Sequence, residues 1–151
     1  VDTSKAPLTY VTYTDSKTSV SMTLPYSFGW GTMNCPPVQT HPEGEILFGP
    51  SRRGEGGAGR ESGIIIEAPS STAAIRALAA SDVAQSELEN KTIRQRTVNG
   101  LTVLSYSYSV GMASGNVWVA VGRTHVYWIH SSGWLTDAEA IKIIQSLKVV
   151  K

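Results

Sequence analysis

Apolar and polar residues alternate along the first third of the chain with the period of a β-strand. In SVSMTLP, residues 19–25, every second residue is apolar, which predicts a strand with one buried face. The preceding segment, LTYVTYTD at 8–15, is rich in threonine, tyrosine and valine, which favour a pleated surface. We expect a turn at Ser16-Lys17 between the two segments, and we expect Pro25 to end the second strand.

Two further apolar runs, EILFG at 45–49 and SGIIIEAP at 62–69, flank a glycine-rich stretch. Three glycines within residues 54–59 spell G-x-G-x-x-G, the spacing of a dinucleotide-binding loop. Such a loop must open directly into a helix whose first amides hold the pyrophosphate. Here an isoleucine triplet follows, which is typical of a strand. We therefore interpret residues 50–62 as a flexible loop between two strands rather than a phosphate site.

A helix is predicted after the isoleucine segment. Ser70 and Ser71 precede the alanine-rich run TAAIRALAASDVAQSELE, and a serine hydroxyl there can accept a hydrogen bond from a free amide of the first turn. The apolar periodicity weakens after Ser81-Asp82, where a second short helix can begin.

The clearest pattern lies in residues 92–110, where Asn99-Gly100 separates two strand-like runs. Both residues tolerate positive φ, so the pair predicts the tight turn of an antiparallel hairpin. A second turn is expected at Gly115-Asn116 and a third near Arg123-Thr124. The strands joined by these turns, ending with HVYWIH at 125–130, form an antiparallel meander.

The chain closes with a helix. Thr136 and Glu139 have the spacing of a capping box, in which the two side chains satisfy each other's backbone amides. Lys142 and Lys148 are expected to face water, and Lys148 suits the negative end of the helix. The expected apolar stripe consists of Ala140, Ile141, Ile144 and Leu147.

This order of elements predicts one α+β domain over residues 1–151, an antiparallel β-sheet with helices packed on it. A chain of 151 residues buries enough surface to fold without a disulfide or a metal. The formal net charge of +1 gives no general attraction to nucleic acid or to an anionic membrane. No apolar run is long enough for a transmembrane segment. The start, VDTSKAP, we interpret as a form from which an export signal has been removed.

Candidate catalytic chemistry is sparse. Three histidines are present, but there is no G-x-S-x-G motif. His130-Ser131-Ser132 is suggestive only because it adjoins Gly133-Trp134 at a strand end, and we interpret it as a strand-end histidine followed by a turn. A metal site could in principle use Cys35, His41, His125 and His130. None of the usual metal-ligand spacings occurs among them, so we predict neither a metal nor a cofactor.

Aromatic and arginine side chains remain as the candidate binding groups. The segment 25–30 concentrates three aromatic residues, and the glycine-rich loop carries three arginines that could dock an acidic protein or a lipid headgroup. We expect the two segments to form a partner-binding surface made of Tyr26, Phe28, Trp30, Arg52, Arg53 and Arg60.

Several of these segments together resemble the PsbP-like superfamily. They are the early strand with Pro and Gly-Trp (SVSMTLPYSFGW), the hairpin with its Asn-Gly turn (TVNGLTVLSYSYSV), and the closing helix (AIKIIQSLKVV). That superfamily includes a photosystem subunit, DcrB-type and LpqN-type bacterial lipoproteins, and secretion chaperones. The resemblance implies an α/β/α sandwich, no catalysis, and an accessory role in binding a partner.

We therefore expect a non-enzymatic protein-binding module, an exported protein or lipoprotein domain of the periplasm or cell envelope, of adaptor, chaperone or immunity type. One alternative is a carrier for an apolar or lipid ligand. Another is a hydrolase that uses His125 or His130. An enclosed apolar cavity would favour the carrier, a Ser–His contact in a cleft the hydrolase, and an open aromatic-arginine surface the protein binder.

Overall fold

The structure is a computed structural model, and it describes residues 9–26, 38–40, 44–48, 62–67, 93–110, 113–131 and 135–150. In chain order the described elements are β1 (Thr9–Asp15), β2 (Val20–Tyr26), β3 (Val38–Thr40), β4 (Ile46–Phe48), β5 (Ser62–Glu67), β6 (Arg94–Val98), β7 (Leu101–Val110), β8 (Ala113–Val121), β9 (Val126–Ser131), α2 (Asp137–Ser146) and β10 (Lys148–Val149).

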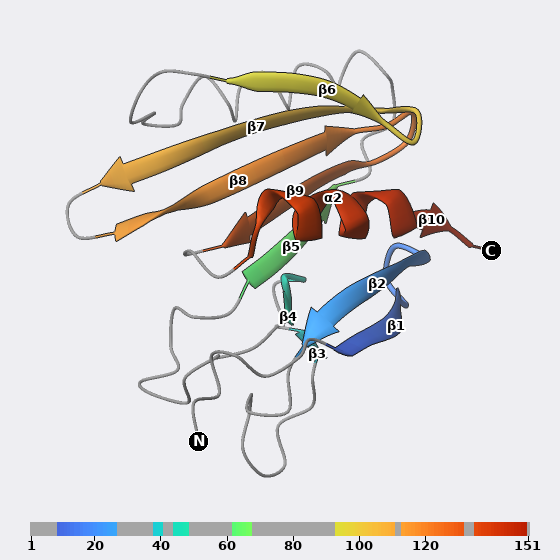
Figure 1. Cartoon of the computed structure of the whole chain (residues 1–151). Helices are drawn as coiled ribbons and strands as arrows, with labels where there is room; N and C mark the ends of the chain where they lie inside the picture. The colour runs from blue at the N-terminus through green and yellow to red at the C-terminus, as the bar shows by residue number, and fades with distance from the viewer. Residues whose placement is uncertain are drawn as a thin grey trace, which may run out of the picture.

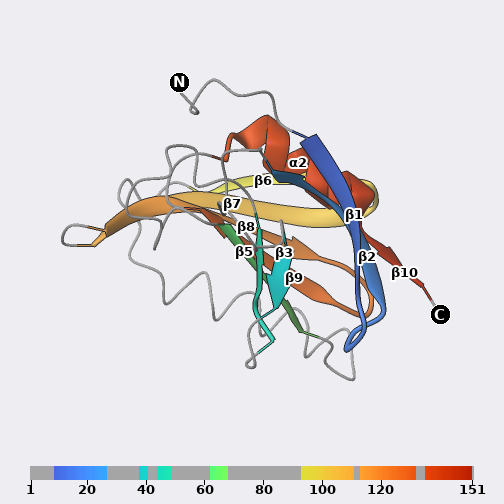
Figure 2. The same ribbon diagram turned by 90° about the horizontal axis from the view of Figure 1, so that it is seen from below.

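These strands form two antiparallel sheets. The larger has seven strands in the order β3-β4-β5-β9-β8-β7-β6, and the smaller has three in the order β1-β2-β10. Helix α2 lies across one face of the large sheet, beside the β1–β2 hairpin (Figures 1 and 2). The predicted α+β class, an antiparallel sheet with a helix packed on it, is confirmed. The predicted middle helix falls outside the described residues.

The meander of β6 to β9 forms as the pattern predicts, except at one turn. Asn99 and Gly100 have φ of 51° and 79°, as the tight turn between β6 and β7 requires. The turn predicted at Gly115-Asn116 is wrong, because both residues lie within β8 and face Tyr108 and Ser107. Cross-strand pairing along the ten-residue β7 outweighs the local turn preference of a Gly-Asn pair.

The isoleucine triplet continues as sheet. Strand β5 pairs with β4 on one side and with β9 on the other, both antiparallel. Ile64 is completely buried in the centre of this arrangement. The strands on either side of the glycine-rich loop are therefore those predicted, and no helix follows the loop in the way that a phosphate site needs. The loop itself lies outside the described residues.

Other strand boundaries differ from the prediction. Pro25 does not end β2 but pairs with Tyr10 inside it. The opposite edge of β2 pairs with β10 only at Val20 and Ser21, so the missing N–H of Pro25 costs no described ladder bond. Strands β3 and β10 were not predicted, and Lys148 belongs to β10 rather than to the helix end.

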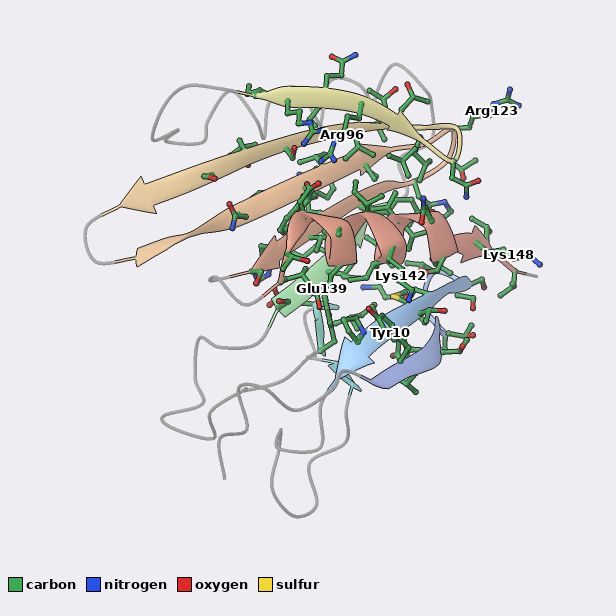
Figure 3. All side chains as sticks on the ribbon, in the orientation of Figure 1. Tyr10, Arg96, Arg123, Glu139, Lys142 and Lys148 are labelled. Atoms are coloured by element: carbon green, nitrogen blue, oxygen red, sulfur yellow. The ribbon has the colours of Figure 1, made fainter. Side chains whose placement is uncertain are left out.

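The main core lies where α2 meets both sheets. The capping box forms, with Glu139 N–H donating to Thr136 Oγ1 over 3.2 Å and Thr136 N–H to Glu139 Oε1 over 2.8 Å. The buried helix residues are Ala140, Ile143 and Ile144. Ile143 is buried although it was not in the predicted stripe. The reason is that a helix packed between two sheets buries a wider arc of its surface than a helix packed on one sheet. Lys142 reaches back over the ring of Tyr10, 4.0 Å from its centroid (Figure 3).

The far face of the large sheet carries a second, smaller apolar cluster. Tyr106, Val119 and Val126 are buried there, and the half-buried Trp128 packs against them. Its neighbour Tyr127 belongs to the core on the α2 side. Tyr127 and Trp128 lie on opposite sides because successive side chains in a strand point to opposite faces.

Candidate functional site

A hollow among the described residues lies where β6 begins. Strand β6 pairs with β7 only between Arg94↔Ser105 and Val98↔Leu101, whereas β7 continues to Val110. An open groove of about 410 Å³ occupies this place, beside the start of α2. Its lining comprises Arg94, Ser105, Tyr106, Ser107, Asn116, Val117, Trp118, Leu135, Thr136 and Asp137.

The floor of the groove continues the face of the sheet on which α2 lies, but its chemistry is different. Under the helix this face presents Val103 and Ala120, which are fully buried, and we call this part the covered half. Beyond the first turn of α2 the same two strands present Ser105, Ser107 and Asn116, which we call the groove half. There the Ser107 hydroxyl donates to Asn116 Oδ1 over 2.7 Å.

An arginine, an aspartate and a tryptophan form the boundary between the two halves. Arg96 donates through both terminal nitrogens to the Asp137 carboxylate, over 2.7 and 2.6 Å. Trp118 Nε1 donates to the same carboxylate over 3.0 Å. Asp137 is the first residue of α2, so these bonds fix the start of the helix on β6 and β8. A negative charge at this position also suits the helix dipole.

This network sets the charge of the groove. The hydrogen bond from Arg96 is the main cause that lowers the pKa of Asp137 to about 2, and Trp118 and Arg94 lower it further. The same bond raises the pKa of Arg96. Asp137 is therefore ionised at neutral pH and is unsuited to proton transfer there. Arg94, Arg96 and Asp137, the three charged groups of this network, together carry one net positive charge.

The two arginines of β6 on this face differ in how far they are engaged. The side chain of Arg96 is 19% exposed and holds Asp137 in two short bonds. The side chain of Arg94 is 65% exposed, and its nearest approach to Asp137 is 3.9 Å. Arg94 is thus a cation available at the mouth of the groove, whereas Arg96 is part of the fold.

Strand β6 is also joined to the other end of α2. Asn99, in the turn after β6, donates from Nδ2 to the carbonyl oxygen of Gln145 over 3.3 Å. Arg96 contacts the first residue of the helix and Asn99 contacts its last turn, so the β6–β7 hairpin is connected to both ends of α2.

His130, one of the two candidate catalytic histidines, is paired on the far face of the sheet. Its Nε2 contacts the carboxylate of Glu45, across the strand that carries Gly63 between them. A Cβ at position 63 would collide with both side chains, so the glycine makes room for this pair. Ser131 points to the other face, where its hydroxyl accepts from Leu135 N–H over 3.3 Å. The adjacent His130 and Ser131 therefore do not meet.

His125 lies on the α2 side at the opposite end of β9. Its ring stacks on Tyr127 with centroids 5.9 Å apart, and Nδ1 lies 2.8 Å from the hydroxyl of Thr124. Burial lowers the pKa of His125 and raises that of Tyr127. Among the described residues, neither histidine has a hydrogen bond to a serine or faces the groove.

The predicted partner-binding residues are not located by the structure. Phe28, Trp30, Arg52, Arg53 and Arg60 lie outside the described residues. Tyr26 ends β2, but its side chain is not among those described. The candidate metal ligands Cys35 and His41 lie outside as well. That surface therefore stays a prediction.

The groove was not predicted as a site, although its residues left two signals in the sequence. The serines at 105, 107 and 109 form an unusual polar row on a long strand. The run TIRQR at 92–96 places Arg94 and Arg96 two residues apart in the first strand of the hairpin, and so on one face. Only the fold brings Asp137 to this place, since it lies 41 residues from Arg96 in the chain.

Comparisons with known proteins connect the chain with solved folds only. No family model matches the sequence, and no curated protein sequence is similar to it. A crystal structure of a protein from Bacteroides thetaiotaomicron VPI-5482 is similar with a TM-score of 0.56 and 13% identity over 93% of this chain. This chain spans 48% of that protein, about half its length.

The solution structure of cyanobacterial PsbP (CyanoP) from Synechocystis sp. PCC 6803 is similar with a TM-score of 0.49 and 17% identity. It covers 97% of this chain, which in turn covers 95% of that protein. At these identities a likeness concerns fold alone, and neither match bears on the DcrB-type or LpqN-type lipoproteins. Within the described ranges, α2 is too short and too polar to cross a membrane.

Proposed function

We propose that this protein is a non-enzymatic module that binds another protein, and that it acts outside the cytoplasm as an exported protein or lipoprotein domain. The observation that carries the proposal is the groove beside the start of α2. Its described lining offers hydroxyl, amide and guanidinium groups, which are binding groups, and its one carboxylate is held by Arg96 and Trp118.

Features of the structure support the proposal over the two alternatives. A carrier for an apolar ligand needs an enclosed apolar cavity, whereas this groove is open and its floor is formed by Ser105, Ser107 and Asn116. A Ser–His hydrolase needs a serine hydroxyl within hydrogen-bond reach of the histidine, in a cleft. Among the described residues His130 instead contacts Glu45, and the hydroxyl beside His125 belongs to Thr124, which does not line the groove.

The test is affinity capture with the purified protein from the envelope fraction of the organism that encodes it, followed by reconstitution with the captured protein. We expect a stoichiometric complex of the two purified proteins. A screen with ester, amide and phosphoester substrates runs in parallel. Turnover that disappears in His130→Ala or His125→Ala would contradict the proposal, as would the failure of any captured protein to bind after purification.

A further inference from the structure

We propose that the outer edge of β6 binds an extended acidic segment of the partner protein as an additional β-strand, with an acidic side chain of that segment on Arg94. This inference rests on the proposed protein-binding function and names the chemistry of the partner. Three observations carry it: the place of β6 in the sheet, the direction of its backbone groups, and the charge at the groove.

Strand β6 ends the order of the large sheet. Within the described part of the chain its one neighbouring strand is β7. Solvent reaches the strand at Ile93, which is 41% exposed, and at Gln95 and Thr97, which are exposed too. An edge of this kind presents unpaired N–H and C=O groups to any extended chain.

The register shows which backbone groups of β6 point outward. In a hairpin with a two-residue turn, the residues that flank the turn exchange hydrogen bonds, here Val98 and Leu101. Hydrogen-bonded pairs recur at every second residue, so the backbone N–H and C=O groups of Arg96 and Arg94 also point towards β7. The N–H and C=O groups of Gln95 and Thr97 therefore point to the outer edge, where an incoming strand would meet them.

The charge selects an acidic partner rather than a second copy of this chain. Arg96 is neutralised by Asp137, so within this described network the uncompensated charge is that of Arg94, whose side chain is 65% exposed. A strand beside β6 with a carboxylate on the same face would meet that charge. Two copies joined at β6 would instead place arginines of like charge on one face, which disfavours the pairing.

The shorter length of β6 provides room for the rest of such a segment. Past Arg94 the strand ends, while β7 continues from Tyr106 to Val110 along the groove. A segment that pairs with β6 can thus extend over Ser107 and Asn116, whose polar groups suit a peptide backbone.

The experiment selects phage-displayed random peptides on the immobilised protein and measures binding of the enriched peptide by fluorescence anisotropy. We expect enriched peptides to be acidic, free of proline at their centre, and weaker binders at higher salt. Arg94→Glu should weaken binding by roughly tenfold or more through charge reversal. Thr97→Pro should also weaken it by about tenfold, because it removes an outward N–H.

Arg123→Glu is the matched control, since it makes the same charge change at an exposed arginine in the turn between β8 and β9, away from the groove (Figure 3). It should alter binding by less than about twofold. Thermal unfolding shows whether Thr97→Pro is folded, and Arg94→Glu, a surface change, decides the question if it is not. Enrichment of non-acidic peptides, no enrichment, or equal binding by Arg94→Glu would overturn the inference.

Two further results separate this inference from the proposed function. A captured partner that binds Arg94→Glu and Thr97→Pro as well as the original protein would leave the protein-binding function standing and refute the β6 site. A dimer of the protein alone, in analytical ultracentrifugation, that is lost in Thr97→Pro would assign the edge to a second copy and overturn the inference.

Discussion

The covered half and the groove half of the α2 face are built on the same two strands, yet they have different tasks. In the covered half, Val103 and Ala120 are fully buried beneath the helix. A few residues along, Ser105, Ser107 and Asn116 form the floor of an open groove. The change from apolar to polar side chains occurs where the first residue of α2, Asp137, is held by Arg96 and Trp118. One continuous face thus supplies both core and candidate binding surface, and the helix start is the border.

The largest effect on stability should come from the core that α2 and the covered half form together. Ile143→Ala removes a fully buried side chain between the two sheets and should lower the free energy of unfolding by about 2–5 kcal/mol. Urea denaturation measures the loss. Ile143→Val, which removes a single methyl group, serves as the control and should cost about 1 kcal/mol. If Ile143→Ala cost as little as Ile143→Val, the covered half would not be the main source of stability.

A smaller effect should come from the border itself. Asp137→Asn weakens the bonds from Arg96 and Trp118 and should lower the free energy of unfolding by about 1–2 kcal/mol. This loss of free energy is at the lower end for hydrogen bonds to charged groups, because the Asp137 side chain is 47% exposed and its charge is therefore screened by solvent. Arg94→Gln, on the same strand as Arg96, should lower the free energy of unfolding by less than about 0.5 kcal/mol. If Asp137→Asn and Arg94→Gln cost the same, Arg94 would be as much a part of the fold as Arg96.

The border should also be sensitive to acid. The pKa of Asp137 is lowered in the folded state from 3.8 to about 2, so its contribution to stability is present above pH 4 and is lost as pH falls through this window towards 2. The difference in unfolding free energy between the original protein and Asp137→Asn should therefore shrink between pH 5 and pH 2. A difference that stays constant over this range would show that the carboxylate charge is not what holds the helix start.

The smallest effect on stability should come from the groove half. Ser107→Ala removes an exposed hydrogen bond to Asn116 and should change the free energy of unfolding by less than about 0.5 kcal/mol. The same variant is useful in binding measurements, because a loss of affinity without a loss of stability assigns Ser107 to recognition. A large loss of stability would place the groove floor in the core and blur the distinction between the two halves.

Much of the fold could be predicted from local patterns. The Asn99-Gly100 turn, the isoleucine strand and the capping box at Thr136 each depend on residues close together in the chain, and each forms as predicted. The errors occur where distant partners decide. Gly115-Asn116 is held in β8 by pairing with β7, and Pro25 is tolerated in β2 because its outer edge has no described ladder there.

The candidate site could not be predicted in the same way. Arg94 and Arg96 look alike in the sequence, and only the position of Asp137 makes one structural and leaves the other available. Among the described strands, the part of β7 that has no neighbour on the β6 side depends on where β6 begins, which no short motif specifies. The aromatic and arginine segments that the sequence favoured stay a prediction. The groove beside α2 and the edge of β6 form a different surface.

The contacts of the β6–β7 hairpin with both ends of α2 have a consequence for the rate and strength of association. With Arg96 anchored at Asp137 and Asn99 at Gln145, the edge strand is already immobilised before any ligand arrives. An incoming segment would then lose its own conformational entropy on binding, but the receptor strand would lose almost none. Amide hydrogens of Arg96 and Val98 should accordingly exchange with solvent slowly even in the unliganded protein.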